Sequence, residues 1–434
     1  MKHAKIYYSY QTKLALANFP FSTTPVHKEL VVAMASIKEA TAFAHMQAGE
    51  IDPEVAKAII RAAREVRKGV FSDQFFLPGL QGGAGTSIHM NVNEVIATRA
   101  VELLSKTRTS TVVHPNDHVN KGQSTNDVGP SALKLACIPL VKGLLQTLDE
   151  AAKAFSEKAV TFSHVEKLGR THLQDAVPTT FGEEFGSYAA VIQNGKRRLE
   201  TVLPFLYELN LGGTAIGNTI NASAKYRSEV YKALRRITKY KVKPAENLMS
   251  QTSSQTDFVF VSQVLTAIMT DLSKIANDLR LLASGPNGGF GEIALQELQP
   301  GSSIMPGKVN PILPESINQA YFAISGNNLT IEMAAQAAQL ELGVMIPVIA
   351  DRLISSLRLS HEVITAFTAN CVRTLEVNEK RCRTHLENSS AYATMLTPEL
   401  GYEQVSQMVK KSRKEGRSFQ SSISSLQLEV EHLR

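Results

Sequence analysis

Apolar residues recur at steps of three and four over long stretches of the chain. Between residues 258 and 283 this stripe consists of Val261, Val264, Leu265, Ile268, Leu272, Ile275, Leu279 and Leu282. Such spacing places apolar side chains on one face of a helix. Because neither proline nor glycine interrupts residues 251–284, the pattern predicts a helix over most of this stretch.

Comparable stretches lie at about 131–160, 179–203, 315–343 and 346–369. Helices of this length need packing partners along their whole span. The pattern therefore predicts an all-α protein with a central bundle of five long helices. No alternating pattern of comparable strength indicates a β-strand.

Three domains are expected around this bundle. Shorter helical stretches at 27–48 and 53–68 belong to an N-terminal helical domain, residues 1–123. The bundle occupies residues 124–378, and a small helical domain with loops follows at 379–434.

Four polar islands interrupt the helical pattern: GGAGTSIHMNVNE (82–94), HPNDHVNKGQSTND (114–127), GRTHLQDAVPTT (169–180) and GSSIMPGKVNP (301–311). Each one alone could be a helix cap or a plain turn. Together they indicate one shared polar site, in which hydroxyls, amides and backbone N–H groups suit a carboxylate better than a metal. His114 and His118 bracket a Pro-Asn-Asp segment rather than lie on one helix face, so zinc is disfavoured. No phosphate-binding or dinucleotide motif is evident, and no metal or cofactor is expected.

Composition and charge limit the kinds of binding partner that are expected. The 434 residues carry a net charge of +6, and the densest basic run, at 409–417, lacks the aromatic residues typical of nucleic-acid binding. A mild positive surplus is compatible with a small anionic substrate. The three cysteines, together with the lack of an apolar leader or of eighteen consecutive apolar residues, predict a cytoplasmic protein without a membrane segment.

With these blocks assembled, the chain resembles the aspartase/fumarase superfamily. GSSIMPGKVNP is similar to the superfamily signature, and the other three islands match its shared blocks in the expected order. The resemblance implies a homotetramer with a core of twenty helices. It also implies active sites that are each shared among three chains, and a reaction that eliminates a group from a small dicarboxylate to release fumarate.

The resemblance also implies roles for individual residues. Ser302 resembles the catalytic base, which removes a proton next to a carboxylate, and His172 resembles a catalytic residue facing the leaving group. Asn126 also resembles a residue at the leaving group, and Glu315 resembles a carboxylate that pairs with His172. Groups similar to the substrate-binding residues of the family are Thr86, Ser124, Thr125, Thr171, Ser303, Lys308 and Asn310.

Four functions compete within this resemblance. Ala84, Thr125 and the run QLELGVMIPVI (339–349) resemble aspartate ammonia-lyases, whereas class II fumarate hydratases typically carry serine at the first two places. Aspartate ammonia-lyase is therefore the preferred interpretation, with fumarate hydratase or a lyase for a substituted aspartate or succinate as alternatives. A structural, non-catalytic member is disfavoured because the signature residues are intact.

The chain also departs from the usual family pattern. His89 stands where asparagine is usual, Asn218-Thr219 stands where Thr-Gly is usual, and the C-terminal region is short. The first two departures lie near the expected site and bear on substrate size or affinity.

Overall fold

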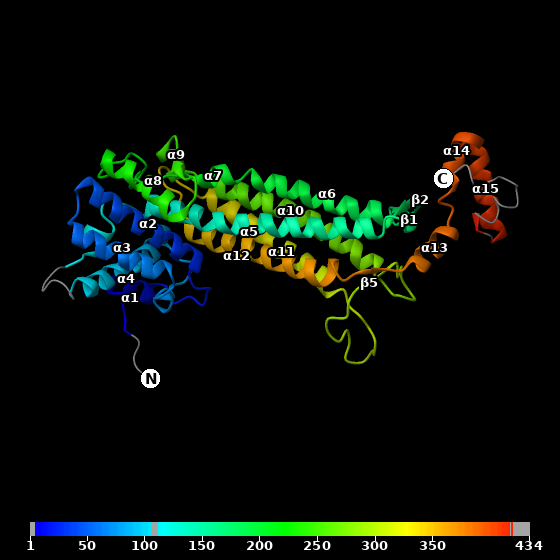
Figure 1. Ribbon diagram of the computed structural model, residues 1–434, viewed down its shortest axis with the longest axis horizontal. Coiled ribbons are helices and arrows are strands. Elements are labelled where there is room, and N and C mark those ends of the chain that lie inside the picture. Colours follow the sequence, from blue (N-terminus) through cyan, green and yellow to red (C-terminus); the bar gives the residue numbers. More distant parts are fainter. Residues whose placement is uncertain (1–4, 106–111, 417, 420–434) are drawn as a thin grey trace. The chain divides into compact units, whose positions relative to one another are not determined.

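The structure, a computed structural model, describes residues 5–105, 112–416 and 418–419. The fold class is all-α, as predicted, with only short β-strands between and beside the helices (Figure 1). Contacts divide the chain into two compact units. Unit 1 comprises Met1–Leu145, Arg197–Ala267 and Phe322–His361, and unit 2 comprises Gln146–Lys196, Ile268–Tyr321 and Glu362–Arg434. The three-domain division of the sequence stays a prediction.

The N-terminal part of unit 1 is a group of helices, α1 (Tyr10–Asn18), α2 (Lys28–Ala48), α3 (Pro53–Arg67) and α4 (Thr86–Leu104). Helix α2 packs against α3 and against α8 (Ala224–Thr238), and α3 packs against α4. Short helical turns complete this part: η1 (Ser72–Gln74), η2 (Gly83–Gly85) and η3 (Pro115–Val119).

Helix α3 illustrates how the sequence defines a helix start. The Asp52 side chain accepts hydrogen bonds from the backbone N–H groups of Glu54 and Val55, at 2.8 and 3.1 Å. Pro53 at the first helical position lacks the N–H that would otherwise need a partner. The buried face then follows the helical period through Val55, Ile59 and Val66.

The five long helices expected from the apolar stripes are all present: α5 (Thr125–Thr161), α6 (Phe181–Glu200), α10 (Thr256–Leu282), α11 (Ile312–Gln336) and α12 (Ile346–Phe367). Side-chain contacts link them within each unit. In unit 2, the Phe155 ring on α5 lies 5.6 Å from Tyr188 on α6 and 6.4 Å from Phe367 on α12. In unit 1, Asn327 on α11 donates to Ser356 on α12.

Several helix boundaries differ from the expected ones, and α11 ends at Gln336, seven residues before the end expected at about 343. The helical conformation is interrupted at Ser254, so the short helix α9 (Leu248–Ser253) is separate from α10. Helix α5 begins earlier than expected and contains Pro130. Proline removes the hydrogen bond to the carbonyl four residues before it, here that of Asn126. In unit 1 the Nδ2 of Asn210 donates to this carbonyl at 3.0 Å, which replaces the lost bond.

Unit 2 contains a β-hairpin that no alternating sequence pattern indicated. Strand β1 (Glu166–Thr171) pairs antiparallel with β2 (Gln174–Thr180). Strand β5 (Ile293–Ala294) also pairs with β6 (Glu376–Val377) in unit 2. In unit 1, β3 (Glu208–Leu209) pairs with β4 (Lys243–Pro244), and the short helix α7 (Leu203–Tyr207) directly precedes β3. The π-turn η4 (Thr368–Val372) follows α12, and α13 (Glu379–Glu387), α14 (Ala393–Leu400) and α15 (Tyr402–Glu415) are the short helices expected near the C-terminus.

Helices α5 and α10 are long and apolar enough to cross a membrane by length and composition alone. Core helices of a bundle have the same properties, and 72% of the most apolar window of α5 is buried within the protein. In unit 1 the ammonium of Lys134 on α5 pairs with Asp257 on α10 at 2.5 Å. The two helices are therefore weak evidence for a membrane span.

Candidate active site

The signature segment 301–311 is a loop that leads into α11. Within it, the Oγ of Ser302 accepts hydrogen bonds from the backbone N–H groups of Ile304 and Met305, at 3.2 and 3.1 Å. The side chain of Ser302 has no apolar core to support, since the loop is exposed or half-buried throughout. Two N–H dipoles directed at one oxygen favour negative charge on that oxygen.

Glycine and asparagine close this loop on itself. The Nδ2 of Asn310 donates to the carbonyl oxygen of Gly301 at 2.7 Å. A Cβ atom at Gly301 would lie 1.8 Å from the carbonyl oxygen of Lys308, far inside any possible contact. The curvature that places Ser302 in the loop therefore requires glycine at position 301.

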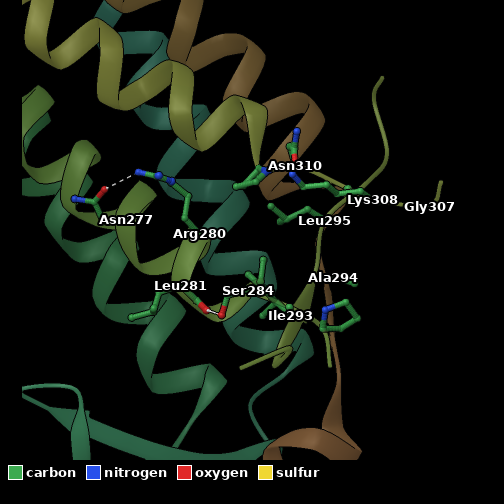
Figure 2. Close-up of a pocket in the computed structure, with 15 residues that line it drawn as sticks. Asn277, Arg280, Leu281, Ser284, Ile293, Ala294, Leu295, Gly307, Lys308 and Asn310 are labelled. Atoms are coloured by element: carbon green, nitrogen blue, oxygen red, sulfur yellow. Dashed lines mark hydrogen bonds between the residues drawn. The ribbon is translucent and has the colours of Figure 1, made fainter. Parts of the chain in front are cut away.

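A pocket of about 670 Å³ in unit 2 is lined by this loop and by the end of α10. Figure 2 shows Lys308 and Asn310 on the loop side of the pocket and Arg280 on α10. The Nη1 of Arg280 donates to Asn318 at 2.9 Å. Lys308 has no carboxylate partner among the residues that the structure describes. Two cations and an amide at one pocket suit an anionic ligand.

Thr171 and His172 lie at the exposed tip of the β1–β2 hairpin, also in unit 2. His172 and Leu173 are the two loop residues, with φ of 54° and 58°. Positive φ at both positions is the requirement of a type I′ turn, which normally takes Asn-Gly. Non-glycine residues in this region cost on the order of 1 kcal/mol or more each, and such strain is typical of functional positions.

Thr86, Ser124 and Thr125 lie at the N-termini of two long helices in unit 1. Thr86 begins α4 and Thr125 begins α5, where unpaired N–H groups and the helix dipole attract negative charge. Ser124 also caps α5, because its Oγ accepts from the N–H of Asn126 at 3.2 Å while its own N–H donates to Asp127. The capping interpretation of this island is thus correct, and it leaves the Ser124 proton available to a ligand.

The side-chain amide of Asn126 has a defined orientation. Its Nδ2 donates to the carbonyl oxygen of Ala215 at 2.8 Å. Because a carbonyl oxygen only accepts, the amide nitrogen must face Ala215, and the Oδ1 atom faces away as an acceptor. The 212–222 loop that supplies this carbonyl carries positive φ at Thr214, Thr219 and Asn221. A β-branched residue such as Thr219 rarely adopts this conformation, so the loop is strained there.

Buried charges support the 120–127 segment, and the sequence analysis did not identify them. Lys38 is fully buried, and its Nζ donates to Asn120 Oδ1 and Gln123 Oε1 at 2.9 and 2.8 Å. Asp127 accepts from the backbone N–H groups of Ser124, Gly212 and Thr214 at 2.9 to 3.1 Å. Burial lowers the pKa of Lys38 well below its ordinary value and raises the pKa of Asp127 to about 6, and each charge opposes the shift of the other.

A second ionic cluster holds the base of the hairpin in unit 2. The carboxylate of Glu292 is fully buried and accepts from Arg170 Nη2 at 2.6 Å and pairs with His385 Nδ1 at 2.7 Å. Lys167 lies 3.7 Å from the other carboxylate oxygen. Burial opposes ionisation, but the hydrogen bonds from Arg170 and His385 outweigh it and hold the pKa of Glu292 below its ordinary value. This cluster ties β1 to the segment after α10 and to α13.

The expected site residues form two groups. Thr86, Ser124, Thr125 and Asn126 are in unit 1, whereas Thr171, His172, Ser302, Ser303, Lys308, Asn310 and Glu315 are in unit 2. Within unit 2, neither a hydrogen bond nor an ion pair joins Glu315 to His172 in the described chain, so their pairing stays a prediction. No group of three or more His, Cys, Asp or Glu side chains in that part of the chain is arranged to hold a metal ion.

The fold and these polar segments define a helical-bundle protein with sites suited to an anion. A family model described as "Lyase" matches residues 2–326. An aspartate ammonia-lyase from a Bacillus species is 42% identical over 95% of this chain and 88% of its own length. A class II fumarate hydratase from Nitrosomonas europaea is 39% identical over 93% of this chain and 88% of its own length.

A solved structure agrees with both matches. The fumarate lyase:delta crystallin from Brucella melitensis, bound to cobalt, superposes with a TM-score of 0.95 and is 42% identical. The match covers 99% of this chain and 94% of that one. The chain belongs to this lyase family, the aspartase/fumarase superfamily that its motifs resemble. The prediction of a lyase is confirmed, and the match to aspartate ammonia-lyases supports a carbon–nitrogen lyase.

Proposed function

We propose that the protein is an aspartate ammonia-lyase, which converts L-aspartate reversibly into fumarate and ammonia. Ser302 removes a proton from the carbon next to the β-carboxylate of the substrate. The electron pair moves into that carboxylate, which becomes a doubly charged aci-carboxylate. This intermediate then forms the carbon–carbon double bond while the C–N bond breaks and ammonia leaves with its electron pair.

A serine oxyanion is an unusual base, and the loop supplies what it requires. The N–H groups of Ile304 and Met305 already donate to the Ser302 Oγ, so an alkoxide there would keep both hydrogen bonds and strengthen them. Lys308, Asn310 and Ser303 hold a carboxylate of the substrate. Their donors stabilise the negative charge that develops during the reaction.

The proposal that ammonia is the leaving group rests on the orientation of the Asn126 amide. The substrate ammonium has only donors to offer and needs acceptors. Asn126 donates to Ala215 and so offers its Oδ1 as an acceptor, and in the described chain no donor reaches that oxygen. His172, on the strained hairpin tip, faces the same group, and Glu315 pairs with it.

The active site is composite, and the protein is a homotetramer with a core of twenty helices. Thr86, Thr125 and Thr171 complete the carboxylate sites from other chains. An apolar stripe on α11 supports this assembly, because Phe322, Leu329 and Met333 are 58 to 65% exposed at helical spacing. The three cysteines are free and buried, which is in keeping with the reducing cytoplasm.

Class II fumarate hydratase is the second candidate, because a relative of that function covers almost the same part of the chain at 39% identity. One experiment separates the two. The purified protein is incubated with L-aspartate and, separately, with L-malate at saturating concentration, and the ultraviolet absorbance of fumarate is followed. Fumarate from aspartate supports the proposal, whereas a kcat/KM for malate more than about tenfold above that for aspartate overturns it.

A further inference from the structure

His89 makes one specific contact with the proposed substrate-binding segment. It lies in the first turns of α4, is 1% exposed, and its Nδ1 is 2.9 Å from the Oγ1 of Thr125 at the start of α5. Both residues belong to unit 1. The contact therefore joins the N-termini of two long helices through a single hydrogen bond, and the direction of that bond decides what Thr125 can offer a ligand.

The surroundings of His89 favour the neutral imidazole, because the ring is 1% exposed and its hydrogen bond is to a hydroxyl rather than to a carboxylate. Burial lowers the pKa of His89 well below its ordinary value, and the positive charge of Lys38 adds to the effect. A neutral imidazole has one N–H donor and one bare nitrogen acceptor. The ring therefore either donates a proton to Thr125 or accepts one from it.

The other ring nitrogen identifies the donor. The Nε2 atom is buried and has no hydrogen-bond partner in the described chain. A buried N–H without a partner is rarer in proteins than an acceptor without one. The single ring proton therefore belongs on Nδ1, from which it donates to the Thr125 Oγ1.

This assignment determines the direction of the threonine hydroxyl. A hydroxyl group has one proton to donate. If Nδ1 accepted that proton, Thr125 would present only lone pairs to a carboxylate, which repel it. With Nδ1–H as the donor, the Thr125 proton is free for the ligand, and the imidazole polarises the hydroxyl that donates it.

We propose that His89 is a positioning residue that directs the Thr125 hydroxyl proton toward a carboxylate of the bound substrate. The inference rests on the proposed function, in which Thr125 binds the substrate, and it applies equally to aspartate and to malate. His89 itself does not touch the substrate. It sets the affinity for the dicarboxylate and has little effect on the chemical step.

Three substitutions test the inference. His89→Asn keeps an N–H donor at the place of Nδ1, because its Nδ2 is also attached to Cγ. His89→Gln keeps the same amide but moves it one bond further out, and His89→Leu removes the donor. Val92→Ala is the control for loosening of α4, since Val92 is fully buried one turn further along the same helix.

The expected result is a separation of KM from kcat. His89→Leu and His89→Gln raise KM for L-aspartate by about tenfold or more, because the Thr125 hydroxyl is no longer held with its proton toward the carboxylate, while kcat changes little. His89→Asn stays close to the unmodified enzyme. The dissociation constant for succinate, a dicarboxylate without a leaving group, rises by the same factors as KM.

The control and the binding measurement distinguish the possible failures. Equal effects of His89→Asn and His89→Gln, or KM changes no larger than those of Val92→Ala at equal thermal stability, would overturn the inference. If His89→Leu does not fold, the asparagine–glutamine pair decides alone. If the unmodified protein turns over neither aspartate nor malate, the proposed function fails, and the succinate series still tests the role of His89.

Discussion

Replacing Ser302 with alanine should remove most of the activity and almost none of the stability. The Ser302 Oγ accepts two backbone N–H groups, from Ile304 and Met305, in a loop that is exposed or half-buried. Water can replace both contacts after the substitution. The free energy of unfolding should therefore fall by no more than about 1 kcal/mol.

The effect on the rate is much larger. If Ser302 is the proton-abstracting group, as proposed, its loss should lower kcat by at least about a hundredfold, which corresponds to about 2.7 kcal/mol of transition-state stabilisation. KM should change little, because the proposed carboxylate-binding residues Ser303, Lys308 and Asn310 remain in place. Fumarate formation from L-aspartate gives kcat and KM, and calorimetry gives the melting temperature.

Ser223→Ala is the matched control. The Ser223 Oγ also accepts a backbone N–H, that of Tyr226 at 3.0 Å, where it caps α8. This variant should lose about 1 kcal/mol of stability, the typical value for a helix cap, and keep its kcat. A Ser302→Ala enzyme with near-normal kcat would show that Ser302 is not the base, and a loss of kcat in Ser223→Ala as large as that in Ser302→Ala would show that the loss is not specific to Ser302.

Two further predictions rest on contacts described above, and a third rests on the proposed sharing of active sites between chains. Gly301→Ala should lower kcat strongly, because the new Cβ would lie 1.8 Å from the backbone carbonyl oxygen of Lys308. Gly288→Ala is the control and should leave kcat unchanged, because no atom lies within 4 Å of its new Cβ. Equal kcat values for the two variants would contradict the requirement for glycine at position 301. Because the folded pKa of Glu292 is lowered, its contribution to stability is present above the ordinary glutamate range and lost as the pH falls through the lowered pKa. Thermal melts should therefore show less acid sensitivity in Glu292→Gln, and an unchanged profile would exclude this role. Ser302→Ala and His172→Ala chains, refolded together as a mixture, should recover part of the activity if active sites are shared between chains as proposed. Activity that stays at the level of the separate variants would count against shared sites.

The long helices could be predicted because their signal is local. The stripe from Val261 to Leu282 repeats with the helical period, and each of its members depends on neighbours three or four positions away. The signature loop was equally visible, since prolines and glycines exclude a helix there and leave Ser302 and Lys308 in a loop. Such features need no knowledge of which helices pack together.

The hairpin and the early start of α5 needed the tertiary structure. The β1–β2 strands are short and polar, and the turn at His172 and Leu173 lacks the glycine that usually indicates a type I′ turn. Pro130 is tolerated inside α5 only because Asn210, eighty positions further along the chain, donates to the carbonyl that the proline leaves unpaired. No local pattern contains that partner.

The sequence by itself therefore determined the helical class, the polar segments and the chemical groups available to a substrate. The tertiary structure decided how those groups are oriented: the acceptor face of Asn126 depends on the carbonyl of Ala215, and the contact of Thr125 depends on His89. The physical reason is one of range. Helical periodicity acts over a few residues, whereas the direction of a buried hydrogen bond depends on side chains that only folding brings within 3 Å of each other.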